Sequence, residues 1–194
     1  MTATRPARIR YPFPTLPDYL APGLDVVFVG INPGTFSLAR GHYFARTTSR
    51  FWPAFSRSRL SAPIRRALGV ATLGPEHDAA LLGFGIGFTD VVKRPSANAS
   101  TLTPADFAEW APRLAARLRR YRPRVACFHG LTAYRPFADL VLRVDTPPVL
   151  GPQPVAVGAT RVFVVPNPSP ANAHFTVHDQ TRWYDRLARF MATP

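Results

Sequence analysis

Three short polar segments, each placed directly after an apolar run, hold the residues most able to do chemistry. They are Asn32, Asp90 and the Asn-Pro-Ser sequence at 167–169. A carboxylate can take a proton near neutral pH, whereas an asparagine amide can only orient a water molecule. Aromatic residues at 42–44 and 51–52 follow the first segment. These residue types predict a site that holds a planar ring and acts on the bond next to it.

The charge balance indicates a polyanionic partner. The chain has 24 Lys and Arg residues against 11 Asp and Glu residues, a formal net charge of +13, and its one lysine is Lys93. Coding bias from a GC-rich genome explains arginine in place of lysine, but it does not explain the excess of base over acid. Such an excess produces a positive field that attracts polyanions such as DNA. A generally basic surface with no specific partner stays open as the alternative.

Length and composition bound the class of protein. The 194 residues are 46% hydrophobic and 18% charged, which is typical of one globular domain with a substantial core. No apolar run is long enough for a membrane span, and the first residues lack the apolar core of a signal peptide. We therefore expect a cytoplasmic protein with no membrane partner.

The metal-binding residue types are sparse. The single cysteine, Cys127, excludes an intrachain disulfide and a cysteine-based zinc site, and its apolar neighbours predict a small core residue. His, Asp and Glu do not cluster at the spacing of metal ligands. The sequence therefore predicts no metal site.

Strands and helices are predicted to alternate along the chain. The expected strands are 25–31, 85–92, 124–129 and 160–166, and the expected helices are 49–60, 75–83, 103–121, 131–142 and 177–191. This alternation predicts a single α/β domain, with a central, mostly parallel sheet of about four strands and helices on both faces. Residues 1–22 are rich in proline and are expected to form an irregular segment over a catalytic domain at 23–194.

The helix at 103–121 has the clearest signals. Thr103 is a good N-cap, Pro104 suits the first turn, and Asp106 stands at the capping-box spacing. Apolar residues recur every three or four positions on one face, and Arg113, Arg117 and Arg120 are expected on the opposite face.

The polar segments are predicted to meet at one edge of the sheet. Residues 32–34, 89–90 and 167–169 each follow a predicted strand. In open parallel sheets, binding sites lie beyond the carboxyl ends of the strands. Asn32, Asp90 and the 167–169 loop are therefore expected to face one site.

These segments also resemble the mismatch-specific uracil/thymine DNA glycosylases, a family within the uracil-DNA glycosylase superfamily. The similarity covers about residues 24–190. It rests on Gly-Ile-Asn-Pro-Gly at 30–34 with Gly41, Phe44 and Ser-Arg-Phe-Trp at 49–52, on the 88–95 segment, and on Asn-Pro-Ser at 167–169.

The resemblance implies hydrolysis of the bond between a damaged or mispaired base and deoxyribose, without a metal or cofactor. By the family pattern, Asn32 positions the water and Phe44 stacks on the flipped base, although Phe44 as a plain core residue stays open. Backbone amides near Ile31, Gly34 and Phe44 are expected to bind the base, and Tyr43 helps to shape the pocket. Flipping costs a few kcal/mol, and less for a mispaired base.

Two departures from the family pattern stand out. Asp90 occupies a position where enterobacterial members carry lysine, so we expect Asp90 to share or take over catalysis as a general base or electrostatic stabiliser. The alternative is that Asp90 caps a turn or pairs with Arg94. The Asn-Pro-Ser segment at 167–169 is not followed by the bulky wedge residue of the family. The expected DNA contact is therefore the loop Asn167, Pro168, Ser169, Pro170, Ala171, Asn172 and His174.

The sequence thus favours a monofunctional DNA glycosylase that acts on uracil or related lesions in DNA and leaves an abasic site for repair. Its expected partner is double-stranded DNA containing uracil or mismatches, with single-stranded DNA left open, and the expected state is a monomer. A DNA-binding module of the same fold without catalysis is one alternative. A nucleotide-binding α/β protein is the other, although no GxGxxG or Walker lysine is present.

Overall fold

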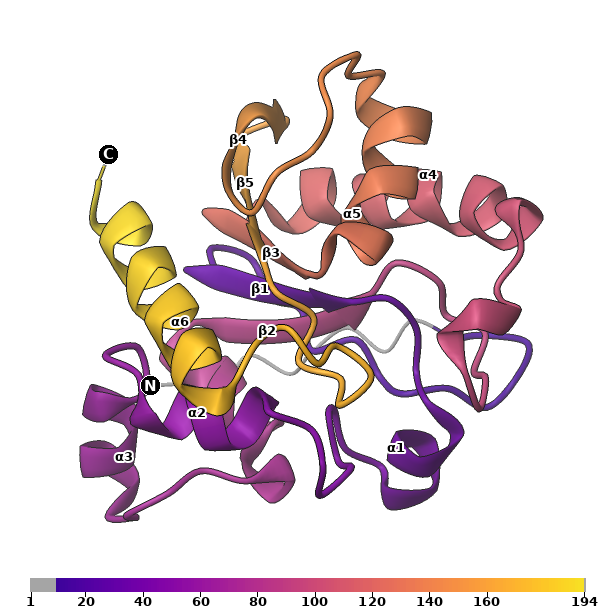
Figure 1. The fold of residues 1–194 in the computed structure, drawn as a ribbon. Helices are drawn as coiled ribbons and strands as arrows, with labels where there is room; N and C mark the ends of the chain where they lie inside the picture. The colour runs from indigo at the N-terminus through magenta and orange to yellow at the C-terminus, as the bar shows by residue number, and fades with distance from the viewer. Residues whose placement is uncertain (1–9, 194) are drawn as a thin grey trace.

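A five-stranded sheet forms the centre of the molecule. The computed structural model describes residues 10–193, and its strands run in the order β2-β1-β3-β5-β4 (Figure 1). The strands are β1 (Val26–Gly30), β2 (Ile86–Asp90), β3 (Val125–His129), β4 (Gly151–Val157) and β5 (Thr160–Val165). Only β4 is antiparallel to its neighbour. The predicted α/β fold with a mostly parallel sheet is confirmed, with one strand more than expected.

Strand β4 is the one that the apolar pattern did not reveal. It contains Pro152 and Pro154, and exposed positions interrupt its buried ones. Proline cannot donate to a strand ladder, so a strand with two prolines is tolerated only at an edge. Accordingly β4 pairs with β5 alone, with a register shift between Pro152 and Ala156.

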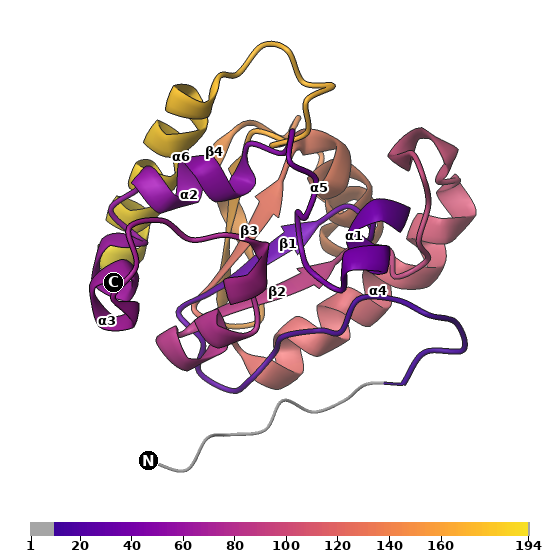
Figure 2. The same cartoon turned by 90° about the horizontal axis from the view of Figure 1, so that it is seen from below.

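Helices cover both faces of the sheet (Figures 1 and 2). On one face, α4 (Pro104–Tyr121) and α5 (Leu131–Phe137) share a core with Val27 and Val29. On the other face, α2 (Phe51–Arg57) and α6 (Val177–Ala192) pack against Val26 and Phe28. The remaining α-helices are α1 (Thr35–Arg40) and α3 (Ala62–Leu68). Successive strand residues thus point to opposite cores, which explains why the strands read as continuous apolar runs.

Helix α4 begins as expected but carries one unexpected side chain. Thr103 and Asp106 form the predicted capping box. Arg117, however, is buried rather than exposed with Arg113 and Arg120. Its guanidinium donates to the backbone oxygen of Asp90 at 3.3 Å and lies 3.7 Å from the Asp18 carboxylate, so interior acceptors draw it inward.

Two predicted helices differ from the structure. Residues 75–83 form two 3₁₀ turns, Pro75–His77 and Ala80–Phe84, instead of one helix. The carboxylate of Asp78 lies between them and accepts the backbone N–H groups of Tyr43 and Ala79, which interrupts the helical ladder. The predicted helix at 131–142 is α-helical only to Phe137, after which Ala138–Leu142 widens into a π-helix.

The described chain ahead of β1, residues 10–25, lies along the sheet without helical structure. Of the predicted irregular segment 1–22, residues 1–9 lie outside the described residues. Residues 11–20, here called the strap, bury Leu16, Asp18 and Leu20, and Tyr19 forms a β-bridge with Phe88. Within residues 10–193, no helix is long and apolar enough to cross a bilayer.

Candidate active site

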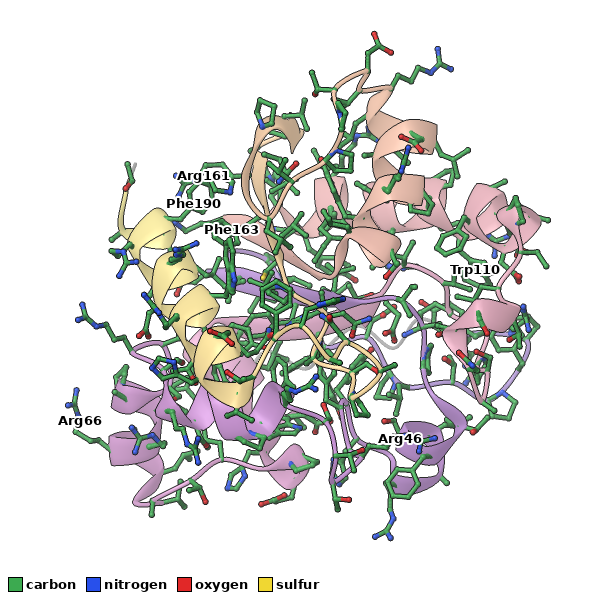
Figure 3. The ribbon with its side chains drawn as sticks, viewed as in Figure 1. Arg46, Arg66, Trp110, Arg161, Phe163 and Phe190 are labelled. Atoms are coloured by element: carbon green, nitrogen blue, oxygen red, sulfur yellow. The ribbon has the colours of Figure 1, made fainter. Side chains whose placement is uncertain are left out.

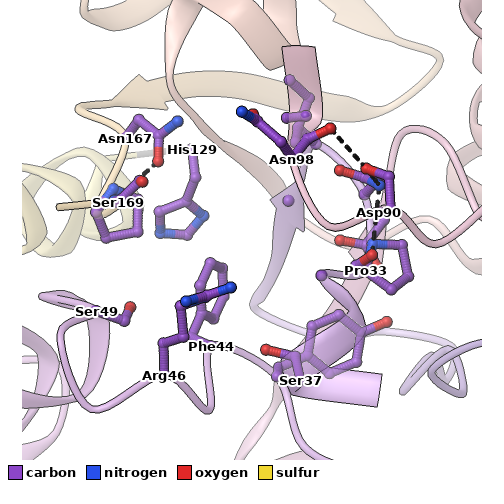
Figure 4. Close-up of a pocket in the computed structure, with 18 of the residues that line it drawn as sticks. Pro33, Ser37, Phe44, Arg46, Ser49, Asp90, Asn98, His129, Asn167 and Ser169 are labelled. Atoms are coloured by element: carbon purple, nitrogen blue, oxygen red, sulfur yellow. Dashed lines mark hydrogen bonds between the residues drawn. The ribbon is translucent and has the colours of Figure 1, made fainter. Parts of the chain in front are cut away.

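A pocket opens at the carboxyl ends of the parallel strands (Figure 4). Gly30, Asp90 and His129 end strands β1, β2 and β3, and all three line it. The chain that leaves β5 contributes Asn167. Of the predicted site residues, the structure brings to this pocket Ile31, Asn32, Gly34, Tyr43, Phe44, Asp90, Asn167, Pro168, Ser169 and Pro170.

The side chain of Asn32 is held in one orientation. Its Nδ2 donates to the backbone oxygen of Arg94 at 3.1 Å and to Oγ of Ser96 at 2.8 Å. Because a carbonyl can only accept, this contact fixes which end of the amide is nitrogen. Within residues 10–193 no protein group donates to Oδ1 of Asn32, so this oxygen is free to accept a hydrogen bond from water.

The segment that holds Asn32 in place is the loop that follows β2. Gly34 forms a parallel β-bridge with Ser96, whose backbone N–H donates to the oxygen of Pro33 at 3.1 Å. Residues 96–99 then form one wall of the pocket. The loops after β1 and β2 are thus joined by backbone hydrogen bonds, which keeps Asn32 and Asp90 in a fixed relation.

Asp90 is a buried carboxylate whose two oxygens have different surroundings. The residue is 3% exposed, and Oδ2 is shielded from solvent with no hydrogen-bond partner among the described residues. Oδ1 lies against Gly30, which lines the pocket, so Oδ1 is the oxygen that can face a substrate. Burial raises the pKa of Asp90 to about 6, although the charge of Lys93 opposes that rise. The alternative pairing with Arg94 does not occur, because Arg94 binds Asp106 at 2.7 Å.

Behind the pocket lies a buried group of charges, which the sequence pattern did not reveal. Lys93 is completely buried, and its Nζ lies 3.0 Å from Oδ1 of Asp18 and 3.7 Å from Oδ2 of Asp90. Arg117 lies on the far side of Asp18, at 3.7 Å. One sequence signal was present: Lys93 is the single lysine of a chain that otherwise uses arginine.

Phe44 presents an aromatic ring to the pocket. Its backbone is in the left-handed region, with a φ of 54°, which is uncommon for a residue with a side chain. Phe51 stacks on the ring at a centroid distance of 4.2 Å with the planes 10° apart. Because Phe51 covers one face of Phe44, only the other face can receive a base. Tyr43 is buried beside it, and its hydroxyl donates to the backbone oxygen of Pro17.

The loop that follows β5 is tied to the start of α2. Nη1 of Arg50 donates to the backbone oxygen of Ser169 at 2.6 Å, and the backbone N–H of Arg50 donates to the oxygen of Pro168 at 2.9 Å. Asn172 donates from its side chain to the backbone oxygen of Asn167, so its amide braces the loop.

Three members of the predicted DNA contact lie outside the pocket wall. They are Ala171, Asn172 and His174, of which Ala171 and His174 are exposed. In the view of Figure 4, the turn that holds Asn167 and Ser169 lies on one side of Phe44 and Asp90 on the other. The loop therefore stands at the mouth of the pocket, where its tip can meet a large ligand.

Charge at the pocket mouth comes from arginine. Arg46 is exposed, lines the pocket, and holds its guanidinium 5.5 Å from the centre of the Phe36 ring. Arg66, on α3, points outward from the molecule (Figure 3). His129, in contrast, is uncharged at neutral pH, because burial lowers its pKa to about 3. Among the described residues there is no group of His, Cys, Asp and Glu that could hold a metal ion.

The sequence matches one known family over most of its length. A family model described as the Uracil DNA glycosylase superfamily matches residues 17–188. The matched region begins within the strap and ends within α6, so it includes every residue that lines the pocket except Leu16.

Proposed function

The chain belongs to the uracil DNA glycosylase superfamily, and on that premise we propose that it is a monofunctional glycosylase that removes uracil from DNA. Membership of the superfamily implies hydrolysis of an N-glycosyl bond in DNA. The proposed substrate is uracil in a duplex, above all uracil mispaired with guanine, and the product is an abasic site. A mispaired base costs less to flip out of the helix, which favours such a substrate.

The observation that carries the proposal is the shared pocket of Asp90, Asn32 and Phe44. A buried carboxylate, an oriented amide and a flat apolar ring are the groups needed to bind a base and to hydrolyse the bond beside it. A stacked base gains about 1–3 kcal/mol from an aromatic ring.

We propose the following division of labour. Oδ1 of Asn32 accepts a hydrogen bond from the attacking water, and Asp90 takes a proton from it. The water oxygen bonds to C1′ of the sugar while the bond from C1′ to the base nitrogen breaks, and the base leaves with the electron pair. Positive charge develops on the sugar as the bond stretches, as in glycoside hydrolysis, and the Asp90 carboxylate stabilises it.

The loop after β5 favours excision that depends only weakly on the base opposite uracil. Its tip offers Pro170 and Ala171, both exposed, and neither has a long side chain to fill the gap left by a flipped base. We therefore propose that excision depends less on the opposing base than on how easily uracil leaves the helix. Excision rates that fall from single-stranded uracil to U:G and then to U:A would support this part of the proposal.

A single-turnover assay tests the function. The protein is mixed in excess with a duplex that contains one uracil, and alkali then cleaves any abasic site. We expect cleavage at the uracil that the Asn32→Ala, Asp90→Asn double variant abolishes. Arg66→Gln, an exposed change on α3, is the matched control and keeps the activity.

The same assay separates the alternatives. Tight binding of uracil-containing DNA by the unaltered protein, without any cleavage, favours a DNA-binding module that lacks catalysis. Activity that survives in the double variant contradicts the roles given to Asn32 and Asp90, even though the glycosylase assignment stands.

A further inference from the structure

The buried charges behind the pocket form a closed group around Asp90. Lys93 Nζ donates to Oδ1 of Asp18 at 3.0 Å and to the backbone oxygen of Leu16 at 2.9 Å, and it lies 3.3 Å from the Tyr43 hydroxyl. Its distance to Oδ2 of Asp90 is 3.7 Å, too long for a hydrogen bond but short enough for a strong ion pair. Lys93 and Asp18 do not line the pocket. They act on the pocket from behind, through the charge of Asp90 and through the contacts of Lys93 with Leu16 and Tyr43.

Asp18 competes with Asp90 for the ammonium group. Its carboxylate accepts hydrogen bonds from Thr89 at 2.6 Å and from Tyr11, in addition to Lys93. Burial alone opposes its ionisation, yet the charges of Lys93 and Arg117 hold the pKa of Asp18 below its ordinary value. Asp18 is therefore a permanent negative charge that draws Lys93 away from Asp90.

The remaining titratable groups around Asp90 are Tyr11, Tyr43 and Arg117. Burial raises the pKa of both the Tyr11 and the Tyr43 hydroxyl, so neither is charged at neutral pH. Arg117 donates to the backbone oxygen of Asp90 and faces Asp18. With Asp90 ionised, two carboxylates face two cations. Protonation of Asp90 leaves one buried positive charge without a partner.

We propose that Lys93 and Asp18 are positioning residues that set, in opposite directions, the pH range in which Asp90 is ionised and the enzyme is active. Lys93 favours the ionised carboxylate of Asp90. Asp18, carried by the strap, limits that effect because it shares the ammonium and adds a negative charge of its own. This inference rests on the proposed role of Asp90 as the group that takes the proton from water.

Two neutral substitutions test the proposal, because they are expected to shift the pH profile in opposite directions. Single-turnover excision of uracil is followed from pH 5 to pH 9, and the midpoint of its acid limb is compared. Lys93→Met removes the cation and moves the midpoint up by about 1 pH unit or more, in line with the effect of an opposite charge at this distance. Asp18→Asn moves the midpoint down, because Lys93 is then left to Asp90 alone.

A matched control removes a contact of the same cluster without changing its charge. Thr89→Val deletes the hydroxyl that donates to Asp18, and it leaves the midpoint in place. A merely structural role for Lys93 and Asp18 predicts lower plateau rates in both variants with an unmoved midpoint. Midpoints that stay fixed, or that move in the same direction, overturn the proposal. Should Lys93→Met fail to fold, the downward shift in Asp18→Asn decides alone.

A second readout separates this inference from the proposed function. The carboxyl carbon of Asp90 is titrated by NMR in protein labelled at aspartate, with Asp90→Asn identifying the signal. We expect its titration midpoint to rise in Lys93→Met and to fall in Asp18→Asn. If the NMR midpoints move while the activity profile does not, Asp90 is not the catalytic carboxylate. If activity requires Asp90 but its NMR midpoint does not move, the control by Lys93 and Asp18 is refuted.

Discussion

Gly30 and Asp90 stand opposite each other on the neighbouring strands β1 and β2, and the Asp90 carboxylate fills the space that a side chain on Gly30 would need. The backbone of Gly30 is ordinary strand, so glycine is not required there for its conformation. What glycine provides is room for Oδ1 of Asp90. The position of the Asp90 carboxylate thus depends on the absence of a side chain at Gly30.

Gly30→Ala should therefore damage catalysis more than folding. A methyl group at this position displaces the Asp90 carboxylate, and misplacement by about 1 Å can cost about 100-fold in rate. We expect single-turnover excision to fall by about that factor. Circular dichroism should show a folded protein. Gly83→Ala, away from the pocket, where an added methyl meets no atom within 4 Å, is the control, and an equal loss of activity there would contradict the argument.

Asp90→Asn should stabilise the protein at alkaline pH while it abolishes or sharply lowers excision. Asp90 has a folded-state pKa of about 6, above the ordinary value of about 3.9. The stability that its bound proton provides is complete below about pH 3.9 and is lost as the pH rises through about 6. Asparagine mimics the protonated form at every pH.

Urea unfolding of the two proteins at pH 5 and pH 8 measures this effect. We expect the free energy of unfolding of Asp90→Asn to exceed that of the unaltered protein by about 1–3 kcal/mol at pH 8, and by less at pH 5. An advantage that is the same at both pH values would show that ionisation of Asp90 is not its source.

Phe44→Leu should weaken excision through the loss of the stacking surface. Leucine keeps an apolar contact with Phe51 but offers no flat face to a base. Because a stack contributes about 1–3 kcal/mol, kcat/KM should fall by about 5- to 150-fold. Phe44→Tyr keeps the ring and is the control. Comparable losses in both variants would assign Phe44 to the core instead of the base.

Arg50→Ala should loosen the loop that follows β5. The change removes the hydrogen bond to Ser169, and a loss of about 1–2 kcal/mol corresponds to about 5- to 30-fold weaker excision. Arg57→Ala, an exposed change at the end of the same helix, removes an equal charge without touching the loop. Hydrogen exchange of residues 167–172 should quicken only in Arg50→Ala. Equal effects in both variants would indicate charge alone.

Arg46→Gln should lower the salt dependence of DNA binding. Each phosphate contact adds about 0.9 to the slope of log K against log salt concentration. If Arg46 at the pocket mouth meets a phosphate, its removal lowers the slope by about one, whereas Arg66→Gln on the exposed side of α3 leaves it unchanged. Titrations by fluorescence anisotropy at several salt concentrations provide the slopes.

The sequence was sufficient for the parallel strands and for the residues that follow them. Each parallel strand is an apolar run between turn residues, and Asn32 and Asp90 lie where two of those runs end, so local pattern places them. Strand β4 could not be predicted because Pro152 and Pro154 break the apolar pattern, although its edge position tolerates them. The charged groups around Asp90 could not be predicted for another reason. Nothing local distinguishes a buried Arg117 from its exposed neighbours on the same helix, since its partners Tyr11, Asp18 and Asp90 are all distant in the sequence.

The strap also affects the order in which the site forms during folding. Asp18 meets Thr89 and Lys93 across 71 and 75 residues, and Tyr11 meets Arg117 across 106. The strap contacts β2, the segment that follows it and α4, so it can dock only after these elements have come together. The sheet can assemble before the strap docks, whereas the electrostatic surroundings of Asp90 cannot. A partly folded chain therefore has a base pocket in which Asp90 still lacks Asp18 as a neighbour. Full activity is expected only when the native state is complete.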